Sequence, residues 1–245
     1  MAAPVRFDHI AIATARLADA PPFVVGQLGG LPDTNDGSGP YRFASWRFAG
    51  GGLLEALEPR GEDGFLHRFL ARHGPGVHHV TFKVPSLRAE CDRAAAHGYE
   101  VVGYDDSRSD WAEAFLHPKQ ALGIVVQLAQ SAGGERARPW TGPPSPADPP
   151  PPVTLIGLRL RARSPERART QWGELLQGEL SEAAGGVLVF RWPGSPMRLT
   201  VETDSVAGEG PVCIEVATDR PLALPAGPHP HLGAVFVRRP PAAVS

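Results

Sequence analysis

The first 130 residues contain the same predicted succession of elements twice, and this duplication restricts the possible folds more than any other feature. Hydrophobic periodicity and turn residues locate the elements of each copy. The first copy has a strand at 5–14, a short helix after "ADAPPF", and strands near 41–49 and 52–58. After a helical stretch at 65–74, the second copy has a strand at 77–84, a helix from Ser86 to about His97, and strands near 112–117 and 123–129. Both copies are interpreted as the order βαβββ.

Polar residues recur in phase with this duplication. Seventy positions separate His9 from His79, and seventy-two separate Glu55 from Gln127. Equivalent strands therefore carry polar side chains at equivalent places. This agreement supports a duplicated unit without reference to any other protein.

A proline-rich segment at 131–152 is predicted to be a linker, because proline disrupts helices and central strands. It separates a domain at 1–130 from a second at 153–245. The second domain is interpreted as a degenerate, truncated copy in which Gly157 takes the place of His9. Its predicted elements are a helix capped at Ser164, strands near 187–192 and 197–203, and a fourth copy that begins at 211–219, has lost its helix and ends at 233–239. The fold class expected is α+β, with paired βαβββ modules forming an open curved barrel and a degenerate second half.

Composition limits the classes of partner. The chain has 24 basic and 26 acidic side chains, so it lacks the basic surface that nucleic acids and anionic membranes attract, and a small-molecule substrate is expected. No leader sequence and no apolar run of about 18 residues is present, so neither export nor a membrane anchor is expected. Cys91 and Cys213 are expected to be reduced and buried, which favours a cytoplasmic protein.

Several strand positions carry polar groups where apolar ones are usual. Side chains two apart in a strand share a face, so Glu55 lies with Leu53 and Leu57, and its carboxylate needs a cationic partner. His79 and its neighbour His78 point to opposite faces, and only His79 matches His9 in phase. Gln127 lies among apolar neighbours.

Together His9, Glu55, His79 and Gln127 are predicted to bind one divalent metal ion: Zn, Co, Mn, Ni or Fe. Taken singly, each histidine is more often a hydrogen-bonded structural residue, and a lone glutamine carries little signal. The coincidence of four such residues in two repeats favours the metal site.

The segments "FDHIAIAT", "LLEALEPRGEDGFLHRFLARHGPGVHHVTFKV" and "AFLHPKQALGIVVQLAQ" resemble the vicinal oxygen chelate superfamily, and methylmalonyl-CoA epimerases most of all. This family comprises glyoxalase I, extradiol dioxygenases and antibiotic resistance proteins. The resemblance implies one metal ligand on each of four strands, at His9, Glu55, His79 and Gln127. Epimerases of this type usually have glutamate at the fourth place, where this chain has Gln127, and simple ones end near residue 130.

The resemblance further implies a metal-dependent epimerase or isomerase that removes a proton beside a carbonyl group. Glu55 is the first candidate for the base and Glu113 the second. Arg47 and Ser45, which share a strand face, are candidates for binding substrate, Arg47 through an anionic group, although a solvated surface arginine is more common.

Two other functions stay open: an extradiol-type Fe(II) dioxygenase, and a non-catalytic binding or resistance protein of the same fold. The degenerate half is interpreted as a stand-in for a partner subunit or a cover over the cleft. The protein is expected to be a monomer or a homodimer.

Overall fold

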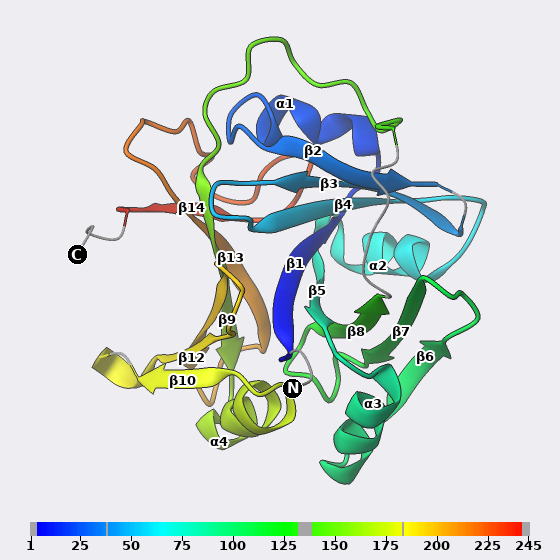
Figure 1. Cartoon of the computed structure of the whole chain (residues 1–245). Coiled ribbons are helices and arrows are strands. Elements are labelled where there is room, and N and C mark those ends of the chain that lie inside the picture. The colour runs from blue at the N-terminus through cyan, green and yellow to red at the C-terminus, as the bar shows by residue number, and fades with distance from the viewer. Residues whose placement is uncertain (1–3, 38, 132–138, 183, 242–245) are drawn as a thin grey trace. The chain divides into compact units, whose positions relative to one another are not determined.

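The computed structural model describes residues 4–37, 39–131, 139–182 and 184–241 (Figure 1). An eight-stranded sheet has the order β2-β3-β4-β1-β5-β8-β7-β6. Its strands are β1 (Arg6–Ala13), β2 (Leu31–Asp36), β3 (Tyr41–Arg47), β4 (Leu53–Pro59), β5 (Gly76–Lys83), β6 (Val101–Asp105), β7 (Trp111–Leu116) and β8 (Val125–Ser131). The four inner strands β4, β1, β5 and β8 are those that carry the predicted ligands.

Helices separate the strands as the duplication predicts. They are a short 3-10 turn η1 (Leu17–Asp19), α1 (Pro21–Val24), α2 (Phe65–His73) and α3 (Leu87–Ala96). The chain thus runs β1-α1-β2-β3-β4 and then, after α2, β5-α3-β6-β7-β8, which is βαβββ twice. The Ser86 side chain accepts a hydrogen bond from Ala89 N and caps α3 as expected, and Gly98 follows the helix with φ at 81°.

The sequence pattern located only two of the three strands that follow each helix. The missed strands, β2 and β6, form the two edges of the sheet. An edge strand pairs on one side only and needs no regular apolar alternation. The sequence of β2, "LPDTND", accordingly contains mostly turn-forming residues.

A second sheet has six strands in the order β10-β11-β12-β9-β13-β14. They are β9 (Thr154–Ala162), β10 (Glu179–Glu182), β11 (Leu188–Arg191), β12 (Arg198–Thr203), β13 (Gly210–Ala217) and β14 (Phe236–Arg239). The helical segments between them are α4 (Pro165–Ala168), which Ser164 caps, the π-helical η2 (Arg169–Leu175) and the 3-10 turn η3 (Ala184–Gly186). No helix lies between β13 and β14, where all residues are described, as the sequence predicts.

The fold is α+β with two open sheets, which confirms the predicted class of paired βαβββ modules with a degenerate second half. The described residues 139–153 between the sheets form neither helix nor strand. Two compact units can be distinguished. The first comprises residues 1–9, 79–136 and 158–212, and the second comprises residues 10–78, 137–157 and 213–245. Each takes residues from both sides of the proline-rich segment, so the division into domains at 131–152 stays a prediction.

The first unit has an aromatic core. The ring of Phe82 stacks on Phe7 at 5.2 Å and contacts Trp172 and Trp192 at 6.1 and 4.8 Å between centroids. In the same unit, Gly123 has φ at 79°, and a Cβ there would lie 2.5 Å from the carbonyl oxygen of Glu209, so only glycine fits. Residues 153–245 therefore contribute side chains to the core next to β5.

The second unit is held by contacts of α1 and of the segment before β9. Phe23 packs on Phe236 at 4.8 Å, and the backbone N–H of Val153 donates to the carbonyl oxygen of Leu28 at 2.9 Å. Both cysteines are buried, Cys91 in the first unit and Cys213 in the second, and no disulfide forms among the described residues. Within the described ranges, every helix is too short or too polar to cross a membrane.

Candidate metal centre

His9 and His79 face one another from the neighbouring strands β1 and β5. Their ring centroids lie 5.8 Å apart, and the residues are 8% and 5% exposed. His78 points the opposite way, where its ring contacts Phe65 and Phe69 of α2 at 5.6 and 4.8 Å. Burial lowers the pKa of His78 to about 4, because it disfavours the charged imidazolium. The predicted alternation of the two histidines is confirmed.

Glu55 joins the two histidines. One donor atom each of His9, Glu55 and His79 can be chosen so that all three lie within 4.8 Å of one another. Glu55 comes from β4, which is the neighbour of β1 in the sheet, and is 9% exposed. Two imidazole nitrogens and one carboxylate oxygen are ligands that zinc, iron and related divalent ions accept. The donor chemistry of these residues therefore fits a metal ion.

Asp8 orients the His9 ring. Asp8 Oδ2 lies 3.0 Å from His9 Nδ1, and Asp8 Oδ1 accepts from Arg6. Burial alone would raise the pKa of Asp8, but the hydrogen bond to His9 and the charges of His9, Lys83 and Arg6 lower it to about 2. The ionised carboxylate can only accept, so Nδ1 carries a proton, and Nε2, which faces the Thr81 hydroxyl, is the ring atom that could bind a metal in its unprotonated form.

The Thr81 hydroxyl connects the side chain of Gln127 with that of His9. The Thr81 hydroxyl lies 2.8 Å from His9 Nε2 and donates to Gln127 Oε1 at 2.6 Å. Thr81 and Gln127 are directly opposite one another in the parallel pair β5 and β8, and both are buried. The structure thus brings the fourth predicted ligand to the same side of the sheet as His9.

Glu113, on β7, contacts the NH₂ end of the Gln127 side chain, whereas Thr81 contacts the carbonyl end. Its Oε2 accepts from Gln127 Nε2 at 2.7 Å and from Trp111 Nε1 at 2.8 Å. The Lys83 ammonium lies 3.7 Å from the centroid of the Trp111 ring. Since both contacts of Glu113 use one oxygen as an acceptor, its environment suits a residue that holds Gln127 better than a free base.

The two residues predicted to bind substrate have other partners. Ser45 is directly opposite Glu55 in the pair β3 and β4, but its buried hydroxyl bonds to the Thr34 hydroxyl at 2.8 Å. Arg47 is half-exposed, and its Nε donates to Asp33 Oδ1 at 2.9 Å. An ion pair with a neighbouring strand thus occupies the Arg47 guanidinium. Their predicted role stays a prediction.

Three residues near the centre were not predicted to have a role: Asp8, Thr81 and Trp111. Thr81 follows His79 by two positions and so shares its face, which was a usable signal. Asp8 precedes His9 and would be placed on the opposite face by strict alternation. Its contact with the His9 ring depends on side-chain geometry that the sequence pattern does not contain.

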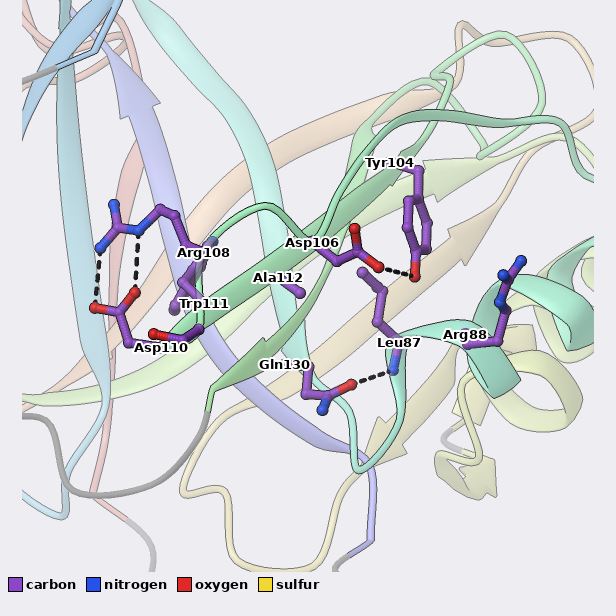
Figure 2. Close-up of a pocket in the computed structure, with 10 residues that line it drawn as sticks. Leu87, Arg88, Tyr104, Asp106, Arg108, Asp110, Trp111, Ala112 and Gln130 are labelled. Atoms are coloured by element: carbon purple, nitrogen blue, oxygen red, sulfur yellow. Dashed lines mark hydrogen bonds and ion pairs between the residues drawn. The ribbon is translucent and has the colours of Figure 1, made fainter.

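Trp111 also lines a surface pocket of about 240 Å³ beside the start of α3 (Figure 2). Its polar side chains pair mostly with one another. Tyr104 Oη donates to Asp106, Arg108 pairs with Asp110, and Gln130 Oε1 accepts from Leu87 N at 2.7 Å. None of the four predicted metal ligands lines this pocket.

Comparisons with known proteins show what the chain is similar to. A family model described as the glyoxalase/bleomycin resistance protein/dioxygenase superfamily matches residues 8–115. An ethylmalonyl-CoA/methylmalonyl-CoA epimerase from Cereibacter sphaeroides is 32% identical over 81 residues, which cover 31% of this chain and 60% of that protein. The match therefore spans less than two thirds of the epimerase.

Two solved structures resemble nearly the whole chain. A hypothetical protein from Staphylococcus aureus has a TM-score of 0.65 at 11% identity, covering 96% of this chain and 99% of that one. A mutant 4-hydroxymandelate synthase from Streptomyces coelicolor has a TM-score of 0.61 at 18% identity, covering 89% and 72%. At these identities the likeness shows the fold alone. Residues 8–115 of the chain are thus similar to the glyoxalase/bleomycin resistance protein/dioxygenase superfamily.

Proposed function

We propose that this protein is a metal-dependent isomerase that moves a proton on a carbon next to a carbonyl group. The observation that carries the proposal is the gathering of two imidazoles and one carboxylate, His9, His79 and Glu55, within 4.8 Å. The similarity to an epimerase of acyl-CoA thioesters supports the same chemistry. The substrate class is a small carbonyl compound or thioester with an acidic α-hydrogen.

His9 Nε2, His79, Glu55 and the Gln127 amide oxygen are the groups that would hold the divalent ion. A divalent ion bound there would supply electrostatic stabilisation of negative charge on the substrate oxygen. Glu55 is proposed as the group that accepts the proton. Glu113 is the weaker candidate because its Oε2 already accepts from Gln127 and Trp111. Each 1.36 kcal/mol by which these groups lower the barrier raises the rate about tenfold.

A second candidate is oxygen chemistry on Fe(II). Two histidines and one carboxylate form the ligand set typical of non-haem Fe(II) oxygenases, and His9, His79 and Glu55 provide that set. Gln127 is neutral, so the set has a single negative charge in either case.

Elemental analysis of the untagged protein tests the metal site. We expect about one divalent ion per chain, and its loss in His79→Ala. His78→Leu is the matched control, because His78 faces Phe65 and Phe69 and should leave the metal content unchanged. A protein that binds no divalent ion even after reconstitution would contradict the proposal and favour a non-catalytic binding protein.

The chemistry is then tested on the metal-loaded protein. We expect solvent deuterium to enter the α-position of methylmalonyl-CoA or a smaller α-acidic carbonyl compound, and Glu55→Gln to slow this exchange at least tenfold. Oxygen uptake by the Fe(II)-loaded protein without such exchange would favour the second candidate.

A further inference from the structure

The Gln127 side chain has a polar partner at each end. Its Oε1 accepts from the Thr81 hydroxyl at 2.6 Å, and its Nε2 donates to Glu113 Oε2 at 2.7 Å. The residue is 5% exposed, so water cannot easily replace either partner. The two ends of an amide have nearly the same shape but opposite hydrogen-bonding character. Its partners therefore decide which end faces His9.

Glu113 is the partner that distinguishes the two ends. Its Oε2 also receives the Trp111 indole N–H, which can only donate, so this oxygen acts as an acceptor at both contacts. An acceptor requires the NH₂ end of Gln127 and turns the carbonyl end toward Thr81 and His9. Thr81 alone does not select an end, because a hydroxyl can donate or accept.

We propose that Glu113 is a positioning residue that presents the Gln127 carbonyl oxygen, and not its NH₂ group, to the metal centre. This inference rests on the proposed metal site. A metal ion binds the carbonyl oxygen of an amide, whereas the NH₂ end would oppose it. Glu113 thus makes a neutral glutamine a dependable oxygen ligand at a place where a carboxylate would need no such support.

Trp111 completes the arrangement by holding Glu113. Its N–H bonds to Glu113 Oε2, and the Lys83 ammonium packs against its ring. In the pair β7 and β8, Glu113 is opposite Ala129 and Phe115 is opposite Gln127. The Glu113 carboxylate therefore contacts Gln127 from an adjacent position on the same face of the sheet. This contact does not require Glu113 itself to reach the metal ion.

The test is a titration of Co(II) into the metal-free full chain, read by calorimetry and by the visible absorption of bound Co(II). We expect Glu113→Leu to weaken binding about 10- to 100-fold and to change the spectrum, as the loss of a group behind a ligand does. Glu113→Gln should bind within a few-fold of the parent with the parent's spectrum, because its amide oxygen still accepts from Gln127 Nε2. Trp111→Phe should likewise weaken Co(II) binding and change the spectrum. This variant replaces Glu113→Leu in the test if Glu113→Leu does not fold.

The double variant Glu113→Leu/Gln127→Leu distinguishes positioning from a general effect. If Glu113 acts through Gln127, the double variant binds Co(II) no more weakly than Gln127→Leu alone. Asp110→Asn, which removes an exposed carboxylate on the same segment, is the charge control and should bind as the parent does. Parent-like binding and spectrum in Glu113→Leu, or fully additive losses, would overturn the inference while the metal site stands. A parent chain that binds no Co(II) would remove the proposed function itself.

Discussion

At the scale of single residues, the Asp8 carboxylate is the group that sets the His9 tautomer. It lies 3.0 Å from His9 Nδ1 and is itself paired with Arg6. A carboxylate that accepts from the remote nitrogen of a ligand histidine fixes the ring and raises its basicity. Glu113 acts on Gln127 in a similar way, because its carboxylate accepts a hydrogen bond from the Gln127 side chain.

Asp8→Ala is expected to weaken divalent-metal binding about 10-fold or more, since the His9 ring loses the acceptor that orients it. Asp8→Asn should lose less, because the asparagine oxygen can still accept from Nδ1–H. Calorimetric titration with Zn(II) measures both. Arg6→Gln removes the ion pair between Arg6 and Asp8 and is the control. An equal loss of metal affinity in this variant would show that charge and not orientation matters.

At the scale of elements, α3 combines a well-formed start with a buried acid. Ser86 caps its first turn, while Glu90 is only 1% exposed and lies 3.7 Å from Arg93 Nη2. Burial raises the pKa of Glu90, and the charge of Arg93 opposes that rise only in part. The ionised form of this carboxylate therefore destabilises the folded chain.

The consequence is a pH-dependent stability. Above the ordinary pKa of glutamate the folded chain binds more protons at this site than the unfolded chain, so the contribution of Glu90 to stability falls as pH rises. The free energy of unfolding of Glu90→Gln should therefore increase relative to that of the parent as the pH rises from 5 to 8. Urea denaturation at both pH values measures the gain. Asp92→Asn, an exposed change on the same helix, should show no such trend, and a gain that does not depend on pH would contradict the assignment.

At the scale of the whole molecule, residues beyond the proline-rich segment complete a core that begins in the first repeat. Trp172 and Trp192 pack against Phe82, and Trp192 also contacts Phe7 at 5.8 Å. Trp172 is fully buried, and its indole N–H has no hydrogen-bond partner among the described residues. Its contribution to stability is therefore one of packing.

Trp172→Ala is expected to lower the free energy of unfolding by about 3–5 kcal/mol, because it leaves a large cavity in this core. Trp172→Phe should cost much less, since it keeps a ring and removes an N–H that forms no hydrogen bond. Denaturant unfolding followed by circular dichroism measures both. Similar losses for the two variants would show that the indole N–H, and not volume, is what the site requires.

How much could be predicted from the sequence is clearest at individual positions. The inner strands β1, β4, β5 and β8 were located, and His79 was separated from His78 by alternation alone. The edge strands β2, β6 and β10 were missed, because a strand paired on one side does not need a regular apolar pattern. The roles of Glu55, Gln127, Glu113, Arg47 and Ser45 stay predictions, to which the structure adds partners.

The sequence by itself determined that a unit is duplicated and on which strand face His9, His79, Glu55 and Gln127 lie. Both follow from periods of two to four residues that are local in the chain. Only the tertiary structure decided that β1 lies beside β5 and β5 beside β8, which brings Thr81 between His9 and Gln127 and Glu113 behind them. It likewise paired Arg47 with Asp33. Such contacts depend on strand order and register, which join residues far apart in sequence and are set by the packing of the whole fold.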